Sequence, residues 1–104
     1  MNISHKNAIE KFKKNALNIL KDNLLDILIY GSVARNEAKQ DSDVDIIVVV
    51  KKNAFKTQMK LAALAFDILM ETGEYLSVQT LKSKDLKRDT IFLHNVRRDS
   101  IHAL

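Results

Sequence analysis

The chain has 104 residues and a formal net charge of +4, a length that suits one domain spanning residues 1–104. It contains no cysteine, which excludes disulfides, thiolate catalysis and cysteine-ligated zinc and suits a reducing, cytoplasmic location. The longest apolar run, at residues 46–50, is too short to cross a bilayer, so we expect no membrane contact. The lysines are scattered, as on a solvated surface, and are not gathered into a binding stripe. We therefore do not expect direct nucleic-acid binding to be the main function.

Two elements are predicted before the first glycine. Apolar residues at helical spacing indicate an amphipathic helix over residues 4–22, with Ser4 as its N-terminal cap. The apolar run at residues 27–30 predicts a buried strand that ends at Gly31.

The next stretch leads into the most strongly predicted strand. Residues 32–37 are expected to form a helical turn, and residues 38–42 a polar loop. Residues 44–50 are β-branched almost throughout, which indicates a central, buried strand.

The longest predicted helix spans residues 53–72, and Gly73 stands where a glycine commonly ends a helix. Its apolar residues predict one broad stripe that mostly faces the core. The breadth leaves open an exposed strip for a partner or for a homo-dimer. The stripe consists of Phe55, Met59, Ala62, Ala63, Phe66 and Met70, widened by Leu61, Leu64, Ile68 and Leu69.

Three shorter elements complete the chain. They are a strand over residues 75–81, a short helix near residues 85–88 capped by Ser83, and a last helix capped by Thr90. The apolar residues expected to face inward there are Phe92, Leu93, Val96 and Ile101. This order predicts a small α/β (α+β) domain, in which helices pack on a mixed sheet of three to four strands.

Asp43 and Asp45 open the central strand. Residues two apart in a strand point to one face, with Cα atoms roughly 6.5 Å apart. Two carboxylates this close repel each other without a cation, and oxygen ligands of this kind suit Mg²⁺. The alternative is structural: Asp43 caps the loop and Asp45 is a solvated residue at the strand end.

Gly31 and Ser32 follow the preceding strand directly. Glycine allows a tight turn and a close ligand approach, and the amides at the start of a following helix favour phosphate. A plain turn capped by Ser32 is the alternative. The chain lacks the longer glycine patterns of a P-loop and of a dinucleotide-binding turn, which excludes both folds.

The turn at Gly31 and Ser32 and the pair of Asp43 and Asp45 indicate a nucleotide site more specifically together than either does alone. A phosphate-binding turn follows one strand, and a metal-binding pair opens the next. If the two strands are adjacent, both groups converge on one nucleoside triphosphate, where a metal offsets charge on the phosphates.

The segment from Gly31 to Arg35, with Asp43 and Asp45, resembles the signature of the DNA polymerase β-like nucleotidyltransferase superfamily. It is most similar to the minimal nucleotidyltransferase (MNT) members, over most of the chain. The resemblance implies that Gly31 and Ser32 bind the triphosphate of ATP and that the two aspartates bind catalytic Mg²⁺. Arg35, within the motif, is expected either to contact the nucleotide or to pair with a nearby acid.

Many MNT proteins are the antitoxin of a pair whose toxin is a HEPN-domain ribonuclease. The resemblance therefore implies a HEPN toxin as partner. It implies either AMP transfer from ATP to a tyrosine of that toxin or neutralisation of the toxin by binding alone.

The match to the family fails at one functional position. Active members usually have a third carboxylate on a following strand, expected here near Ser77, and this chain has none there. Glu74 lies at the strand start and is better placed in a turn. A second departure is Asn36, where many relatives have glycine.

Overall fold

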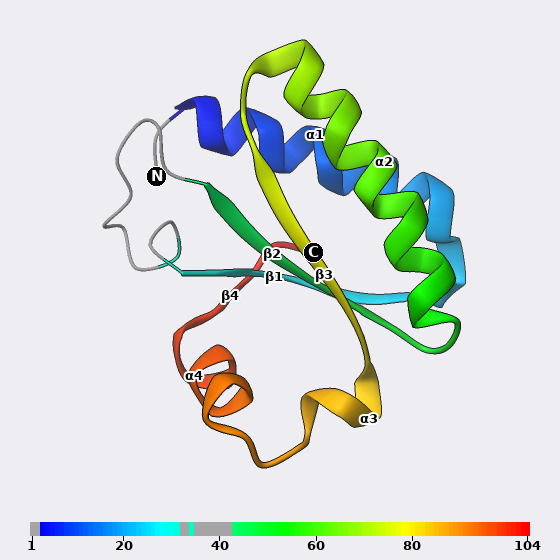
Figure 1. Cartoon of the computed structure of the whole chain (residues 1–104), viewed down its shortest axis with the longest axis vertical. Coiled ribbons are helices and arrows are strands. Elements are labelled where there is room, and N and C mark those ends of the chain that lie inside the picture. The colour runs from blue at the N-terminus through cyan, green and yellow to red at the C-terminus, as the bar shows by residue number, and fades with distance from the viewer. Residues whose placement is uncertain (1–2, 32–33, 35–42) are drawn as a thin grey trace.

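The computed structural model describes residues 3–31, 34 and 43–104, and its centre is a mixed four-stranded sheet in the order β3-β2-β1-β4 (Figure 1). β1 is antiparallel to both of its neighbours, whereas β2 and β3 are parallel. The strands are β1 (Leu24–Tyr30), β2 (Val44–Val50), β3 (Leu76–Lys82) and β4 (Ile101–His102). The predicted fold class is therefore confirmed.

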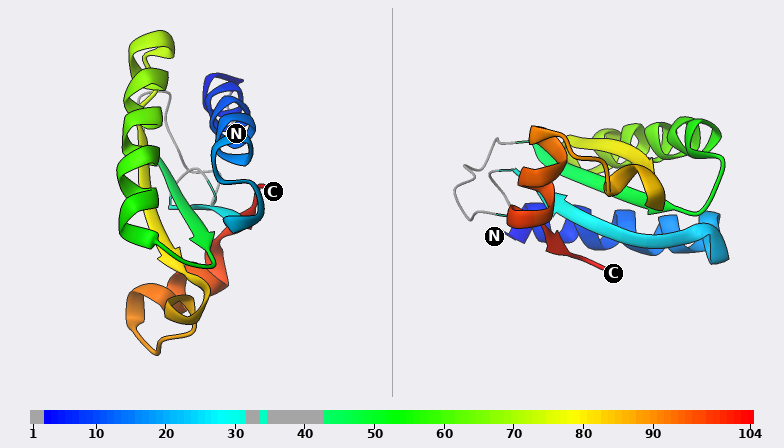
Figure 2. Two further views of the ribbon diagram at one scale, coloured as in Figure 1. Left: turned by 90° about the vertical axis from the view of Figure 1, so that its right-hand side faces the viewer. Right: turned by 90° about the horizontal axis from the view of Figure 1, so that it is seen from below.

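Helices cover both faces of this sheet, the two long ones on one face and the two short ones on the other (Figure 2). A 3-10 turn, Lys21–Asn23, joins the first helix to β1. The helices are α1 (Ile3–Leu20), α2 (Ala54–Thr72), α3 (Ser83–Leu86) and α4 (Ile91–Asp99). Within the part of the chain that the structure describes, no helix combines the length and apolarity that crossing a membrane requires.

β2 is apolar almost throughout because both of its faces are covered. Its even-numbered residues, from Val44 to Val50, join the core beneath α1 and α2, with Phe12 of α1 fully buried among them. Ile47 and Val49 point the other way, into a smaller core with Val96 of α4. Asp45 is two residues before Ile47 in the same strand, so its side chain points to the same face of the sheet, the one covered by α3 and α4.

Several sequence predictions are confirmed at the level of single residues. β2 has the bounds expected. Gly73 ends α2 at φ +78°, and its amide donates to the carbonyl of Leu69 at 2.8 Å. Thr90 caps α4, because its hydroxyl accepts from the amide of Leu93 at 3.1 Å.

Other predictions were wrong in detail. Ser4 lies inside α1, which begins at Ile3, and Ser83 is the first residue of α3 and not its cap. Phe92 is 42% exposed, and Ile101 is 44% exposed because it belongs to the edge strand β4.

The largest correction concerns α2. The expected core stripe mostly faces solvent, with Phe55 81%, Met59 62% and Phe66 58% exposed. The buried face is the opposite one, formed around Leu61 and Ile68, which were expected only to widen the stripe. The helix thus has two apolar faces, of which the sheet and α1 cover one.

Candidate functional site

The end of β1 meets the start of β2 at Gly31 and Asp45. Tyr30, the last residue of β1, is the register partner of Asp45, so the two strands are adjacent. Gly31 has φ +80°, and a Cβ added there would overlap Oδ2 of Asp45 and lie 3.3 Å from its Cγ. The carboxylate of Asp45 therefore occupies space that only a glycine leaves free.

Asp45 is the middle member of a row across three strands. Its register partner on β1 is Tyr30, and on β3 it is Ser77. A pocket of about 150 Å³ opens over this row, lined by Tyr30, Asp45, Ile46, Ile47, Ser77, Gln79 and Phe92. Asp45 is half-buried in it, and Ser77 is exposed.

Asp43 is exposed and stands one residue before β2. The amide of Val44 donates to the carbonyl of Tyr75 at 3.1 Å, which fixes the backbone between the two aspartates. The other two predicted ligand-binding residues, Ser32 and Arg35, lie outside the described residues.

The described site offers two carboxylates and not three. Ser77, not an acid, faces Asp45, as the sequence indicated. Glu74 precedes β3 and lies 3.5 Å from the buried His5, away from the pocket. Among residues 3–31, 34 and 43–104, acidic, histidine and cysteine side chains form no cluster of three that could hold a metal ion.

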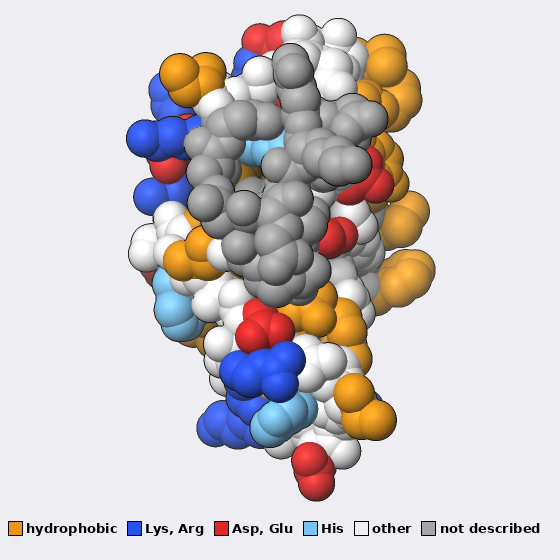
Figure 3. Space-filling model, turned by 90° about the vertical axis from the view of Figure 1, so that its left-hand side faces the viewer, with side chains coloured by type: hydrophobic (Ala, Val, Ile, Leu, Met, Phe, Trp, Pro, Cys, Tyr) orange, Lys and Arg blue, Asp and Glu red, His pale blue; other side chains and the backbone are white. Residues whose placement is uncertain are grey.

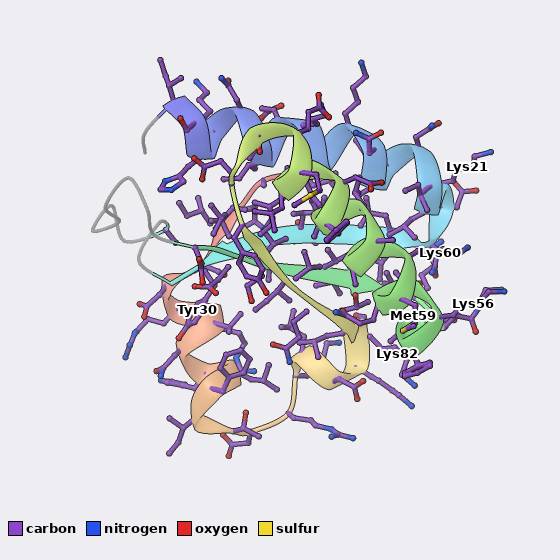
Figure 4. The ribbon with its side chains drawn as sticks, turned by 45° about the horizontal axis from the view of Figure 1, so that its top comes forward. Lys21, Tyr30, Lys56, Met59, Lys60 and Lys82 are labelled. Carbon is purple, nitrogen blue, oxygen red and sulfur yellow. The ribbon has the colours of Figure 1, made fainter. Side chains whose placement is uncertain are left out.

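The structure adds residues that the sequence analysis did not assign to the site. The Phe92 ring meets the Tyr30 ring edge-on, with centroids 5.7 Å apart, and so closes one side of the pocket (Figure 4 labels Tyr30). Gln79 lies two residues after Ser77 on the same face of β3. The alternation of side chains along a strand was the only feature of the sequence that could have placed Gln79 beside the pocket. No sequence pattern indicated Phe92, because α4 reaches the pocket only through the tertiary fold.

A cationic side chain, Arg98, lies near the end of α4. The guanidinium of Arg98 donates to both carboxylate oxygens of Asp99, at 2.9 and 3.1 Å. This hydrogen bonding and the charge of Asp99 raise the pKa of Arg98, with a smaller contribution from Tyr30. The side chain therefore stays charged.

None of the three histidines lines the pocket beside Asp45. His5, a residue of α1, is buried, and the Nδ1 of His102 lies 2.6 Å from Oδ2 of Asp26. His94 is exposed on α4.

Comparison with known proteins defines the class. Residues 7–101 match the sequence model of the family described as Polymerase beta, Nucleotidyltransferase, so the chain belongs to this nucleotidyltransferase family. A protein of Methanocaldococcus jannaschii named "Putative protein adenylyltransferase MJ0141" is 36% identical over 69 residues, covering 60% of this chain and 70% of that protein.

Solved structures with lower sequence identity share the fold. A chain in the crystal structure of a toxin–antitoxin with AMP-PNP gives a TM-score of 0.60 at 17% identity, covering 89% of this chain and 70% of that chain. A chain in the complex of tri-AMPylated Shewanella oneidensis HEPN toxin with MNT antitoxin gives 0.57 at 16% identity, covering 93% and 69%.

Proposed function

We propose that this chain is an MNT antitoxin that binds Mg-ATP and transfers AMP to a hydroxyl of a HEPN toxin. The observation that carries the proposal is the packing of Gly31 against the carboxylate of Asp45, where β1 and β2 meet. It joins the proposed triphosphate turn, Gly31 and Ser32, to the proposed metal ligands, Asp43 and Asp45. Arg35 is proposed as a further nucleotide contact. The AMPylated toxin in the Shewanella complex supports the choice of acceptor.

The chemistry of the two aspartates fits Mg²⁺. This ion is commonly held by one or two carboxylates, with water and phosphate oxygens as its other ligands. Asp43 and Asp45 would hold it, and the ion would offset negative charge on the phosphates. The half-buried position of Asp45 strengthens its attraction for a cation relative to a fully solvated carboxylate.

The proposed reaction is an in-line substitution at phosphorus. The acceptor hydroxyl oxygen forms a bond to the α-phosphorus of ATP, and the bond from that phosphorus to the pyrophosphate oxygen breaks. The products are the AMP ester of the toxin, pyrophosphate and a proton released to water. This chain's contribution is to bind and orient the triphosphate beside the pocket.

Ser77 favours a second candidate function. A hydroxyl opposite Asp45 cannot act as the anionic third ligand or as a strong general base. A chain that keeps the fold and the partner, but transfers AMP poorly, would neutralise the toxin by complex formation alone.

Labelling with ATP carrying a radioactive α-phosphate separates the two candidates. The native chain, mixed with its HEPN toxin and Mg²⁺, should transfer the label to the toxin. The double variant Asp43→Asn/Asp45→Asn should not, although it should still bind the toxin in a pull-down. Transfer that persists in the double variant would refute the assigned site. Silencing of the toxin by both chains, without label on the toxin, would establish the binding function.

A separate prediction concerns the missing acid. Ser77→Asp should make stability depend on Mg²⁺, because the new carboxylate would stand one strand spacing, about 4.8 Å, from Asp45. Without a cation the like charges repel, and we expect the unfolding temperature to fall by about 5 °C in EDTA and to recover with Mg²⁺. Thermal unfolding followed by circular dichroism measures both values.

Ser77→Asn is the matched control, since it has the size of the aspartate without the charge. Its unfolding temperature should be the same with EDTA and with Mg²⁺. An equal response of both variants would show that Asp45 and residue 77 do not share a cation site.

A further inference from the structure

The exposed face of α2 carries a stripe of apolar side chains that the fold leaves uncovered. Figure 3 shows hydrophobic side chains in a file along the side of the molecule where α2 lies. Four of them are large and mostly exposed: Phe55 81%, Met59 62%, Phe66 58% and Met70 67%. Ala62 and Ala63, also exposed, lie between them. We call these six residues the α2 stripe.

The α2 stripe is symmetric about its own centre. Phe55 and Met70 lie equally far from the midpoint between Ala62 and Ala63, and Met59 and Phe66 do likewise. Two copies of the helix, packed antiparallel across this midpoint, would therefore set each phenylalanine against a methionine. The small alanines would meet at the centre, where the backbones approach most closely.

The charged residues beside the stripe also differ between the two halves of α2, basic in the N-terminal half and acidic in the C-terminal half. Lys56 and Lys60 lie on one flank of the N-terminal half, and Asp67 and Glu71 continue this flank in the C-terminal half. Figure 4 shows that Lys56, Met59 and Lys60 come from the same end of α2. An antiparallel pair places the basic half of each flank beside the acidic half of the other, whereas a parallel two-fold pair leaves the two flanks on opposite sides of the contact, without this pairing.

Not all of these charges contribute equally. Glu71 already forms an ion pair with Lys11 of α1. In an antiparallel pair of α2 helices, the main ion pair would therefore join Lys60 of one copy to Asp67 of the second copy.

We infer that α2 is a homodimer interface, in which two copies of this chain pack their α2 stripes antiparallel about a two-fold axis between Ala62 and Ala63. A two-fold contact requires one surface that is complementary to itself, and both the apolar order and the charge order of α2 meet this requirement. The inference does not depend on the proposed nucleotidyltransferase activity, because the pocket at Asp45 lies on the other face of the sheet.

The expected dimer is weak. α2 has 19 residues, so the helix contact is about 28 Å long. A single helix pair buries less than the roughly 800 Å² per partner of a standard interface, so we expect a dissociation constant in the micromolar range.

Analytical ultracentrifugation from micromolar to millimolar concentration tests the dimer. The native chain should shift from monomer to dimer, and Met59→Glu should weaken the association at least about 10-fold, which is 1.4 kcal/mol. The matched control is Ile91→Glu, which changes an isoleucine on α4 that is 84% exposed; it should dimerise as the native chain does. A native chain that stays monomeric, or dimerisation that Met59→Glu leaves unchanged, would overturn the inference.

Because the chain has no cysteine, single introduced thiols can test the orientation. Ala63→Cys should crosslink to itself on oxidation or with a short bis-maleimide. Phe55→Cys should not, because antiparallel packing separates the two copies of residue 55 by about 22 Å. Self-crosslinking of Phe55→Cys would show parallel packing and refute the two-fold arrangement.

A charge exchange completes the test. Lys60→Glu should weaken the dimer, and Lys60→Glu/Asp67→Lys should restore it. If the native chain is monomeric and Met59→Glu instead weakens binding of the toxin, the stripe belongs to that partner, and the homodimer is rejected.

Discussion

Asp45→Asn should abolish metal-dependent ATP binding and leave the fold intact. The carboxylate is half-buried between Tyr30 and Ser77, so an amide there would direct a neutral dipole at the triphosphate and metal proposed to bind at this site. Removal of an outer-shell partner of a metal costs about 10- to 100-fold in affinity, and loss of a ligand should cost at least as much. Isothermal titration calorimetry with ATP and Mg²⁺ measures the change. Stability in urea should stay within about 1 kcal/mol of the native value.

Asp22→Asn is the control for loss of one negative charge. Asp22 lies in the 3-10 turn before β1, at the other end of that strand from Gly31. Its variant should bind ATP as the native chain does. Unchanged calorimetric binding in Asp45→Asn would remove Asp45 from the proposed site.

Gly31→Ala should lose both stability and nucleotide binding. The left-handed φ of +80° disfavours any side chain by about 1–2 kcal/mol. The added methyl group would also overlap the carboxylate of Asp45, which forces that side chain or the strand end to move. We expect a total loss of about 2–4 kcal/mol in the free energy of unfolding, together with weakened ATP binding.

The second glycine of the chain provides a matched control. Gly73 has nearly the same φ, +78°, but an added Cβ would meet nothing within 4 Å. Gly73→Ala should therefore lose only the backbone contribution of about 1–2 kcal/mol and keep full ATP binding. Equal losses of stability and binding in the two variants would show that the contact of Gly31 with Asp45 has no functional effect.

The sequence predicted best those elements whose local pattern and tertiary environment agree. β2 was predicted with its observed bounds, because a β-branched run between Asp43 and Lys51 has few alternatives to a buried strand. Gly31 and Asp45 could be related before the structure, because their placement depends only on two adjacent strands. Ser77 was named only as the place where the family has an acid, and its register position beside Asp45 came from the structure.

The errors arose where the local sequence allows more than one arrangement and tertiary packing determines which one forms. α2 carries apolar residues on two opposite faces, and helical spacing cannot say which face the sheet will cover. β4 has only two residues, Ile101 and His102, and exists because β1 offers a free edge to pair with. Phe92 reaches the pocket because α4 packs beside it. The residues around Gly31 and Asp45 give no indication of where α4 will pack.

The pairing of β4 with β1 also has a consequence for the order of assembly. Leu28 pairs with His102, so this contact closes a loop of most of the chain, and contacts of such long range form late in folding. α4, which brings Phe92 over the pocket, lies directly before β4. During synthesis, the sheet from β1 to β3 can form while residues 91–102 are still within the ribosome, but the pocket beside Asp45 is then open on one side. If the chain binds nucleotide as proposed, a nascent chain should gain its full affinity only after residues 91–102 have emerged and docked.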